Sequence, residues 1–312
     1  MEGRFLSAET CLHFHRLLFF QQQQLKPRYA NCSILISLKI MPAGNFILKH
    51  WCKQQSVFSK NLEGLKRQDK ADTIELVHDL RVATKKLRAY LKLLGILFDK
   101  KDYADLFEKT EQLFNILGKH RDIEMGLEGL KSFEKDKKNS YSAFRYHLEV
   151  GLEQVWTWVR VALDEYEEND LLVLTAKVEK DLEDKSDDEL QMKVKAIVEK
   201  EMNKSRRLTN RMGDQPHLIR KLFKDIFYWA SLLPKTILAP EQLKAIDKSL
   251  NFLGNWQDLE MLHIKIKHFR KDFVPDTKEI HHQLKLLEKM ISGKQQRIVD
   301  KAKESINTAL SH

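Results

Sequence analysis

Residues 77–94 read Val-His-Asp-Leu-Arg-Val-Ala-Thr-Lys-Lys-Leu-Arg-Ala-Tyr-Leu-Lys-Leu-Leu. Apolar positions recur in this stretch at steps of three and four residues, the spacing of one face of an α-helix; they are Val77, Leu80, Thr84, Leu87, Leu91 and Leu94. A second series with the same spacing is basic and comprises His78, Arg81, Lys85, Arg88 and Lys92. Because a helix advances about 100° per residue, each series forms a stripe. The stretch therefore predicts a helix that carries a basic stripe beside its core-facing side.

The basic stripe has no acid within it. Between Leu76 and Phe98 the one acid is Asp79, and its angular position lies off the stripe. Solvated helix faces usually mix charges of both signs at these spacings, because opposite pairs stabilise a helix and like pairs repel. A counter-charge from elsewhere is therefore expected, although a solvated basic face on a helical bundle is the simpler alternative.

The composition indicates an all-α protein with an anionic partner. The 312 residues are 42% hydrophobic and 32% charged, and include 11 Gly and 6 Pro. These values are typical of a helix-rich chain of two domains or of one repeat-built unit. The formal net charge of +9 favours a negatively charged ligand. Since no run of eighteen apolar residues occurs, we expect no membrane span.

The first forty residues differ from the rest of the chain. They hold a glutamine run, Gln21–Gln24, and show no sustained helical period. We expect residues 1–40 to be a disordered extension or a start assigned too early, with Met41 as the true start; we favour the second. The three cysteines, Cys11, Cys32 and Cys52, all lie early, which argues against a disulfide framework and suits a reducing cytoplasm. Cys11, His13 and His15 lack a second ligand pair at a metal-binding spacing.

From residue 45 onward the pattern predicts about ten helices. Gly118 and Gly254 are each expected to close one helix just before the next begins. The acidic span 167–187 is expected to be a linker. The predicted helices are Phe46–Lys66, Thr73–Phe98, Tyr103–Leu117, Arg121–Phe133, Ser140–Glu165, Asp188–Met212, Pro216–Leu233, Glu241–Leu253, Gln257–Phe273 and Thr277–Ala309.

The two halves of the chain resemble each other. The pattern His78-x-x-Arg81-x-x-x-Lys85 reappears as His217-x-x-Arg220-x-x-x-Lys224, and Leu117-Gly118-x-x-x-Asp122-x-Glu124-Met reappears as Leu253-Gly254-x-x-x-Asp258-x-Glu260-Met. The offset is 139 residues at the histidines and 136 at the glycines. Because both motifs recur in the same order and at nearly the same offset, they indicate an internal duplication. We therefore predict two tandem helical-bundle repeats, about 45–166 and 188–310, in a pseudo-two-fold arrangement around a basic groove.

These residues resemble a known family. The run from His78 to Arg88, followed by a Leu-Gly-x-x-Arg121-Asp122 segment, resembles the CHAD domain, the conserved histidine α-helical domain, and the likeness extends over about 41–312. The resemblance implies an all-α fold of two repeats that binds inorganic polyphosphate through basic residues lining a central channel. Some family members associate with polyphosphate granules, and many are fused to or encoded beside CYTH triphosphatase domains.

The second repeat departs from the family pattern. Phe227 stands where the family usually carries arginine, so the basic stripe of the second repeat has fewer cations than that of the first. We therefore expect the first repeat to contribute more of the phosphate affinity. The chain also has no CYTH-like Glu-x-Glu-x-Lys signature, and nothing in it supports a built-in triphosphatase.

Two sets of basic residues are candidates for the binding site. Arginines can fork onto phosphate oxygens, lysines act as mobile point charges, and a histidine can donate from its ring. The primary candidates are His78, Arg81, Lys85, Lys86, Arg88, Lys92, Arg121, His217, Arg220, Lys221, Lys224 and Tyr228. The weaker candidates, for which an ordinary solvated surface is the simpler reading, are Lys49, Lys53, Lys60, Lys200, Lys204, Arg207 and Arg211.

Enzyme and metal chemistry find no support in the sequence. No glycine-rich nucleotide loop, P-loop or Gly-x-Ser-x-Gly motif is present. His78 and His217 lack a Cys, Asp or Glu partner at ligand spacing, and neither His263 and His268 nor the His281-His282 pair suggests a metal site. Asp122 and Asp258 are expected to cap helices or to brace the basic residues by ion pairs. We predict no catalytic residue, no cofactor and no metal.

The sequence leaves two alternatives beside polyphosphate. Nucleic acid is also a phosphate chain, but no recognition helix or stacking platform is apparent, which disfavours it. The chain could also be a helical scaffold whose basic stripes pair with an acidic protein. We expect a non-enzymatic polyphosphate-binding protein of bacterial type. It is expected to be cytoplasmic and able to associate with polyphosphate granules. A separately encoded polyphosphate- or triphosphate-processing enzyme is a candidate partner, and no membrane partner is expected.

Overall fold

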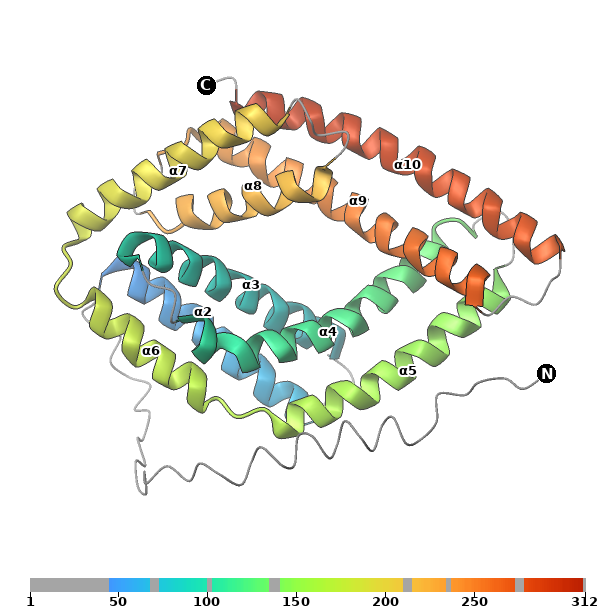
Figure 1. Ribbon diagram of the computed structural model, residues 1–312, viewed down its shortest axis with the longest axis horizontal. Helices are drawn as coiled ribbons and strands as arrows, with labels where there is room; N and C mark the ends of the chain where they lie inside the picture. The colour runs from blue at the N-terminus through green and yellow to red at the C-terminus, as the bar shows by residue number, and fades with distance from the viewer. Residues whose placement is uncertain are drawn as a thin grey trace. The chain divides into compact units, whose positions relative to one another are not determined.

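The computed structural model describes residues 45–67, 73–99, 103–134, 141–209, 215–233, 237–272 and 278–310. These residues form nine helices and no strand, which confirms the predicted all-α fold (Figure 1). The helices are α2 (Phe46–Lys66), α3 (Thr73–Phe98), α4 (Tyr103–Lys131), α5 (Ser142–Glu165), α6 (Asn169–Leu182), α7 (Asp187–Thr209), α8 (Pro216–Ala230), α9 (Pro240–Asp272) and α10 (Lys278–Leu310). The segment 1–40, with its cysteines Cys11 and Cys32, lies outside the described residues.

Helix α3 buries the face that its apolar spacing predicts. All six predicted apolar positions between Val77 and Leu94 are buried, and the Thr84 hydroxyl satisfies its hydrogen bond by donating to the Leu80 carbonyl at 2.8 Å. Burying these side chains stabilises the fold because it removes apolar surface from water. The predicted bounds of α2 and α3 coincide with the observed ones.

Helix α3 lies beside α8, so the two basic helices meet (Figure 1). The Trp229 indole of α8 donates from Nε1 to the Ala89 carbonyl of α3 at 2.7 Å, in buried surroundings. Lys92 of α3 and Asp225 of α8 form an ion pair. These contacts fix the position of α3 along the axis of α8. Helix α4 packs against α3, α9 packs against α8, and α4 and α9 pack against each other.

The predicted helix breaks at two glycines are wrong. Helix α4 runs without interruption from Tyr103 to Lys131, and α9 runs from Pro240 to Asp272. Gly118 and Gly254 therefore lie inside helices, where each has an arginine of the neighbouring basic helix close to it. It follows that Asp122 and Asp258 are mid-helix residues and cap nothing. Gly118, which suggested a helix end, instead makes room for the Arg81 side chain from another helix.

No helix is predicted over 167–187, and this is corrected, because most of the span forms α6. This helix buries Leu171, Leu174, Val178 and Leu182, which are spaced as one helical face. Leu172 and Val173 are apolar but exposed, so they blur the period of the buried face. That the span links two repeats stays a prediction. The predicted duplication and pseudo-two-fold arrangement stay predictions. No helix in the described part of the chain is both long and apolar enough to cross a membrane.

Candidate functional site

Basic side chains from three helices gather where α3 lies against α4 and α8. We call this set the basic cluster; it consists of Arg81, Lys85, Arg88, Arg121, Arg220 and Lys224. Its members lie close enough to act electrostatically on one another. Burial is the largest cause of the lowered pKa of Lys224 on α8, and after Arg220 the cations Lys85, Arg81 and Arg88 of α3 lower it further. The two basic helices thus contribute to one site.

The arginines of the basic cluster each have an acid nearby. Glu111 of α4 binds Arg88 with both carboxylate oxygens, and Glu124 accepts a hydrogen bond from Arg121 at 3.3 Å. Asp122 of α4 and Asp258 of α9 act electrostatically on Arg81 and Arg220. The alternative that these two aspartates brace the basic residues is therefore consistent with their positions.

Burial raises the pKa of both aspartates, and nearby cations act against that rise. For Asp122 the opposing cations are Arg81, Lys265 and Lys85, in that order. Arg220 leads the opposing cations at Asp258, and Asp122 itself adds to the rise there. The carboxyl groups of Asp122 on α4 and Asp258 on α9 thus both lie close to the cations of the basic cluster.

Lys85 and Lys224 are the surplus positive charges of the basic cluster. Neither lysine forms an ion pair within the part of the chain that the structure describes. Burial, followed by the neighbouring arginines, lowers the pKa of Lys85 to about 8. Burial lowers the pKa of Lys224 further, to about 7, with Arg220 and Lys85 adding to the effect. Asp258 acts to raise the pKa of Lys85 but does not offset the other effects. An incoming anion would stabilise the charged form of both half-buried amines.

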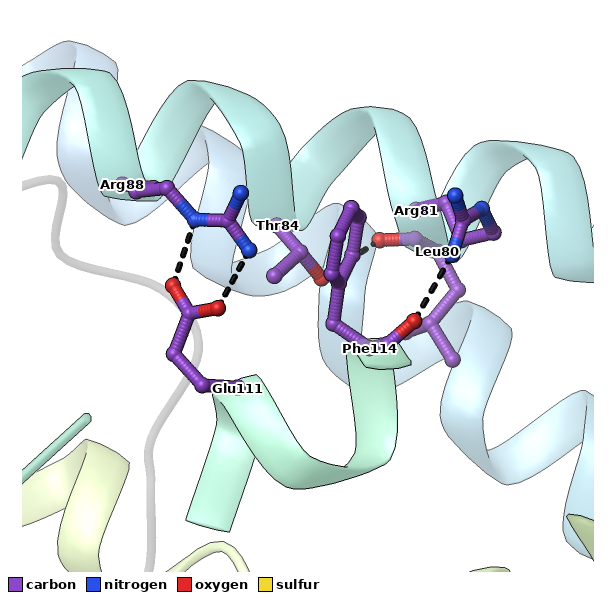
Figure 2. Close-up of polar contacts among 6 residues, drawn as sticks. All are labelled: Leu80, Arg81, Thr84, Arg88, Glu111 and Phe114. Atoms are coloured by element: carbon purple, nitrogen blue, oxygen red, sulfur yellow. Dashed lines mark hydrogen bonds and ion pairs between the residues drawn. The ribbon is translucent and has the colours of Figure 1, made fainter. Parts of the chain in front are cut away.

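Figure 2 shows how α4 holds two arginines of α3. The Phe114 ring lies between them, with the guanidinium carbons of Arg81 and Arg88 at 4.2 and 4.3 Å from its centroid. Arg81 Nη1 also donates to the Phe114 carbonyl at 2.7 Å, while Glu111 holds Arg88 from its other side. Both guanidinium groups are therefore fixed in place before any ligand arrives.

Several primary candidates lie outside the basic cluster. His78 and His217 are exposed near the starts of their helices, and Lys221 is exposed as well. Lys86 is turned toward α2, because its charged neighbours are Lys53 and Asp79. Lys92 is committed to Asp225. Tyr228 stays close to the cluster, since Arg220 acts to lower its pKa against the effect of burial.

The weaker candidates do not gather at the cluster. Lys53 lies near His50 and Lys86, on the α2 side of α3. Lys204 pairs with Glu201 at 3.2 Å. Lys49, Lys60, Lys200 and Arg207 are exposed, and Arg211 lies outside the described residues.

Sequence reasoning missed the residues that support the cluster from α4 and α9. Glu111, Phe114, Gly118 and Asp122 recur at steps of three and four residues and so share one face of α4. Following that face backward from the Leu-Gly-x-x-x-Asp segment would have found the first two. Lys265 lies seven residues after Asp258 and on the same face of α9 by the same rule.

The described residues contain no group of three His, Cys, Asp or Glu side chains that could hold a metal ion. His263, His268, His281 and His282 lie on α9 and α10 and are exposed or half-buried.

Three comparisons relate the chain to known proteins. No curated protein sequence matches it. Among solved structures, it is similar to the crystal structure of the CHAD domain from the plant Ricinus communis, with a TM-score of 0.57 and 14% sequence identity over 85% of this chain and 93% of that chain. At this identity the likeness shows the fold alone. The family model of the CHAD domain matches residues 52–267. Since this match covers more than half of the sequence, the chain belongs to the CHAD domain family.

Proposed function

We propose that this protein binds inorganic polyphosphate, without catalysing its turnover, and that the basic cluster is the binding site. The observation that carries the proposal is the pair of surplus lysines, Lys85 and Lys224, which stand among arginines and come from the two basic helices. Membership of the CHAD family supports polyphosphate as the ligand, because polyphosphate binding is a general property of that family.

The chemistry of the cluster suits a linear chain of phosphates. Arg81 has N–H donors beyond the one that the Phe114 carbonyl accepts, and a guanidinium can bind phosphate oxygens in a fork. Lys85 and Lys224 add compact charges that can follow the chain. Arg88 can contribute only if it shares its donors between phosphate and Glu111. We therefore assign the main affinity to Arg81, Lys85, Arg220 and Lys224.

The role of the bound polymer is a further part of the proposal. Binding without turnover would serve to attach the protein to polyphosphate granules, or to present the polymer to a separately encoded polyphosphate- or triphosphate-processing enzyme. Both roles need a site that retains the polymer and leaves its phosphoanhydride bonds intact.

A competition titration tests the choice of ligand. Fluorescent long-chain polyphosphate is bound to the protein at physiological salt and displaced by unlabelled polyphosphate, duplex DNA, single-stranded RNA or heparin. We expect unlabelled polyphosphate to displace the probe at concentrations at least about tenfold lower, per phosphate or sulfate group, than the other polymers. Equal displacement by all four polymers, with binding that vanishes as salt rises, would leave a generic basic surface and favour the nucleic-acid or acidic-partner alternatives.

A further inference from the structure

Arg81 forms a hydrogen bond to the backbone of α4. Its Nη1 donates to the Phe114 carbonyl at 2.7 Å, and its guanidinium carbon lies 4.2 Å from the centroid of the Phe114 ring (Figure 2). In an α-helix the carbonyl of residue 114 is also the acceptor for the amide of residue 118. The guanidinium group therefore lies against the helix next to Gly118.

A side chain at position 118 would collide with this guanidinium group. A Cβ built on Gly118 would lie 2.8 Å from Arg81 Nη1 and 3.5 Å from both Arg81 Cζ and Nη2. The first distance is shorter than a carbon and a nitrogen can hold without a bond, so one of them would have to move. The arginine is the movable partner, because its atoms are the far end of a flexible side chain while the helix backbone is fixed.

The corresponding glycine in the second half lacks this crowding. A Cβ on Gly254 of α9 would lie 3.8 Å from Arg220 Nη2, which is ordinary van der Waals contact. Both glycines lie inside long helices and one turn before an aspartate, Asp122 or Asp258. Alanine favours the helix over glycine at both positions. The two sites thus differ mainly in whether an arginine must be displaced.

We propose that Gly118 and Phe114 are positioning residues that fix the Arg81 guanidinium group within the basic cluster, so that the affinity for polyphosphate depends on the absence of a side chain at position 118. The expected change in polyphosphate affinity rests on the proposed function, whereas the expected position of the Arg81 guanidinium group does not. Phe114 holds the guanidinium group by its ring and its carbonyl, and Gly118 leaves the space that this position requires.

The test compares Gly118→Ala with Gly254→Ala in the full chain. We expect Gly118→Ala to weaken polyphosphate binding about tenfold, the scale of one charge-assisted hydrogen bond, and Gly254→Ala to change it less than about twofold. Thermal unfolding should show both variants folded, since both gain helix propensity. Equal affinities of Gly118→Ala and the wild type would overturn the proposal.

A double-mutant cycle separates positioning from a general structural effect. If Gly118→Ala acts through Arg81, it should have no further effect on the affinity of the Arg81→Ala variant. An additional loss in the double variant would assign the effect to something other than the guanidinium position and would contradict the proposal. Should Gly118→Ala fail to fold, Phe114→Leu replaces it in the same cycle, and Phe114→Tyr, which keeps the ring, should retain affinity.

A crystal structure of unliganded Gly118→Ala keeps this test distinct from that of the proposed function. We expect Arg81 Nη1 to leave the Phe114 carbonyl and the guanidinium group to shift off the ring, with α4 unchanged. An unmoved Arg81 would refute the positioning role even if polyphosphate binds. If the wild type binds no polyphosphate but Arg81 moves as expected, the proposed function fails and the geometric inference stands.

Discussion

Trp229 of α8 donates a hydrogen bond from its indole nitrogen to the backbone carbonyl of Ala89 in α3, at 2.7 Å and away from solvent. Ala89 directly follows Arg88, and Trp229 directly follows Tyr228. This bond therefore ties the two basic helices together next to Arg88 of the basic cluster and to Tyr228, which lies close to the cluster. Lys92 adds a contact on the same side, with its ammonium nitrogen 5.4 Å from the centroid of the Trp229 ring.

Replacing Trp229 by phenylalanine should loosen this junction. The variant keeps an aromatic ring in the core but loses the N–H donor, so we expect the free energy of unfolding to fall by about 1 to 3 kcal/mol, combining a lost hydrogen bond with a smaller buried side chain. Chemical denaturation followed by circular dichroism measures the change. Trp158→Phe, at a position that is 54% exposed, is the matched control and should be nearly neutral.

The affinity for polyphosphate should decrease as pH rises from about 6 to about 9, because Lys85 and Lys224 lose their protons across this range. The sign follows from the lowered pKa values: an anion favours the charged lysines and raises both pKa values, so binding takes up protons. Calorimetric titrations in buffers of different ionisation enthalpy measure that uptake.

The variant Lys224→Arg should reduce the pH dependence, since a guanidinium group keeps its charge throughout the range. Proton release on binding, or a pH dependence that is the same in wild type and variant, would be incompatible with surplus lysines at the site.

Glu111 should limit the affinity of the site. Its carboxylate binds Arg88 with both oxygens and so competes with phosphate for the same donors. We expect Glu111→Gln to tighten polyphosphate binding by about threefold to tenfold at low salt. Glu108→Gln removes the same charge one turn away on an exposed part of α4 and serves as the control. Weaker binding by Glu111→Gln would mean that the carboxylate positions Arg88 more than it competes for it.

His120 should make the fold sensitive to acid. This side chain is 5% exposed, and its Nδ1 has no hydrogen-bond partner among the described residues, with Glu124 Oε2 at 3.7 Å. Burial, with Arg121 adding to it, lowers its pKa to about 4 from the ordinary 6.5. Since the unfolded chain takes up the proton first, the stability present above about pH 6.5 should fall as pH drops toward 4.

Urea unfolding at about pH 7 and about pH 5 measures this effect, and we expect a loss of roughly 1 to 2 kcal/mol from His120. The variant His120→Phe keeps a ring against Trp156. Its free energy of unfolding should fall less between these two pH values, by the amount that His120 contributes in the wild type. The exposed His268→Ala is the control. An unchanged loss in His120→Phe would assign the acid sensitivity to other groups.

The sequence predicts α3 almost completely, because its two periodic stripes are strong local signals. The periodicity locates the buried face from Val77 to Leu94 and the basic face that holds Arg81 and Lys85. It does not say which neighbour each cation faces. Lys85 lies near Arg220 of α8, whereas Lys86, one residue on, lies near Lys53 of α2. Those environments depend on helix packing, which is a tertiary property.

The errors have the same cause. Gly118 carries the local signal of a helix end, but α4 continues through it, and the glycine makes room for Arg81 from another helix. Helix α6 was missed because the exposed Leu172 and Val173 lie between the buried Leu171 and Leu174 and blur a short apolar period. Glu111 and Phe114 have no distinctive motif, and their role emerges only once α4 is packed against α3.

The most direct measurement of the central claim is a titration of long-chain polyphosphate into two charge-matched variants at physiological salt. Lys85→Ala/Lys224→Ala removes the surplus charges of the basic cluster, while Lys285→Ala/Lys301→Ala removes the same charge from exposed positions on α10. The account predicts that the first variant loses at least about tenfold in affinity and that the second binds like the wild type within about twofold. Equal losses in both variants would show that polyphosphate responds to net charge alone, and would contradict a binding site at the cluster.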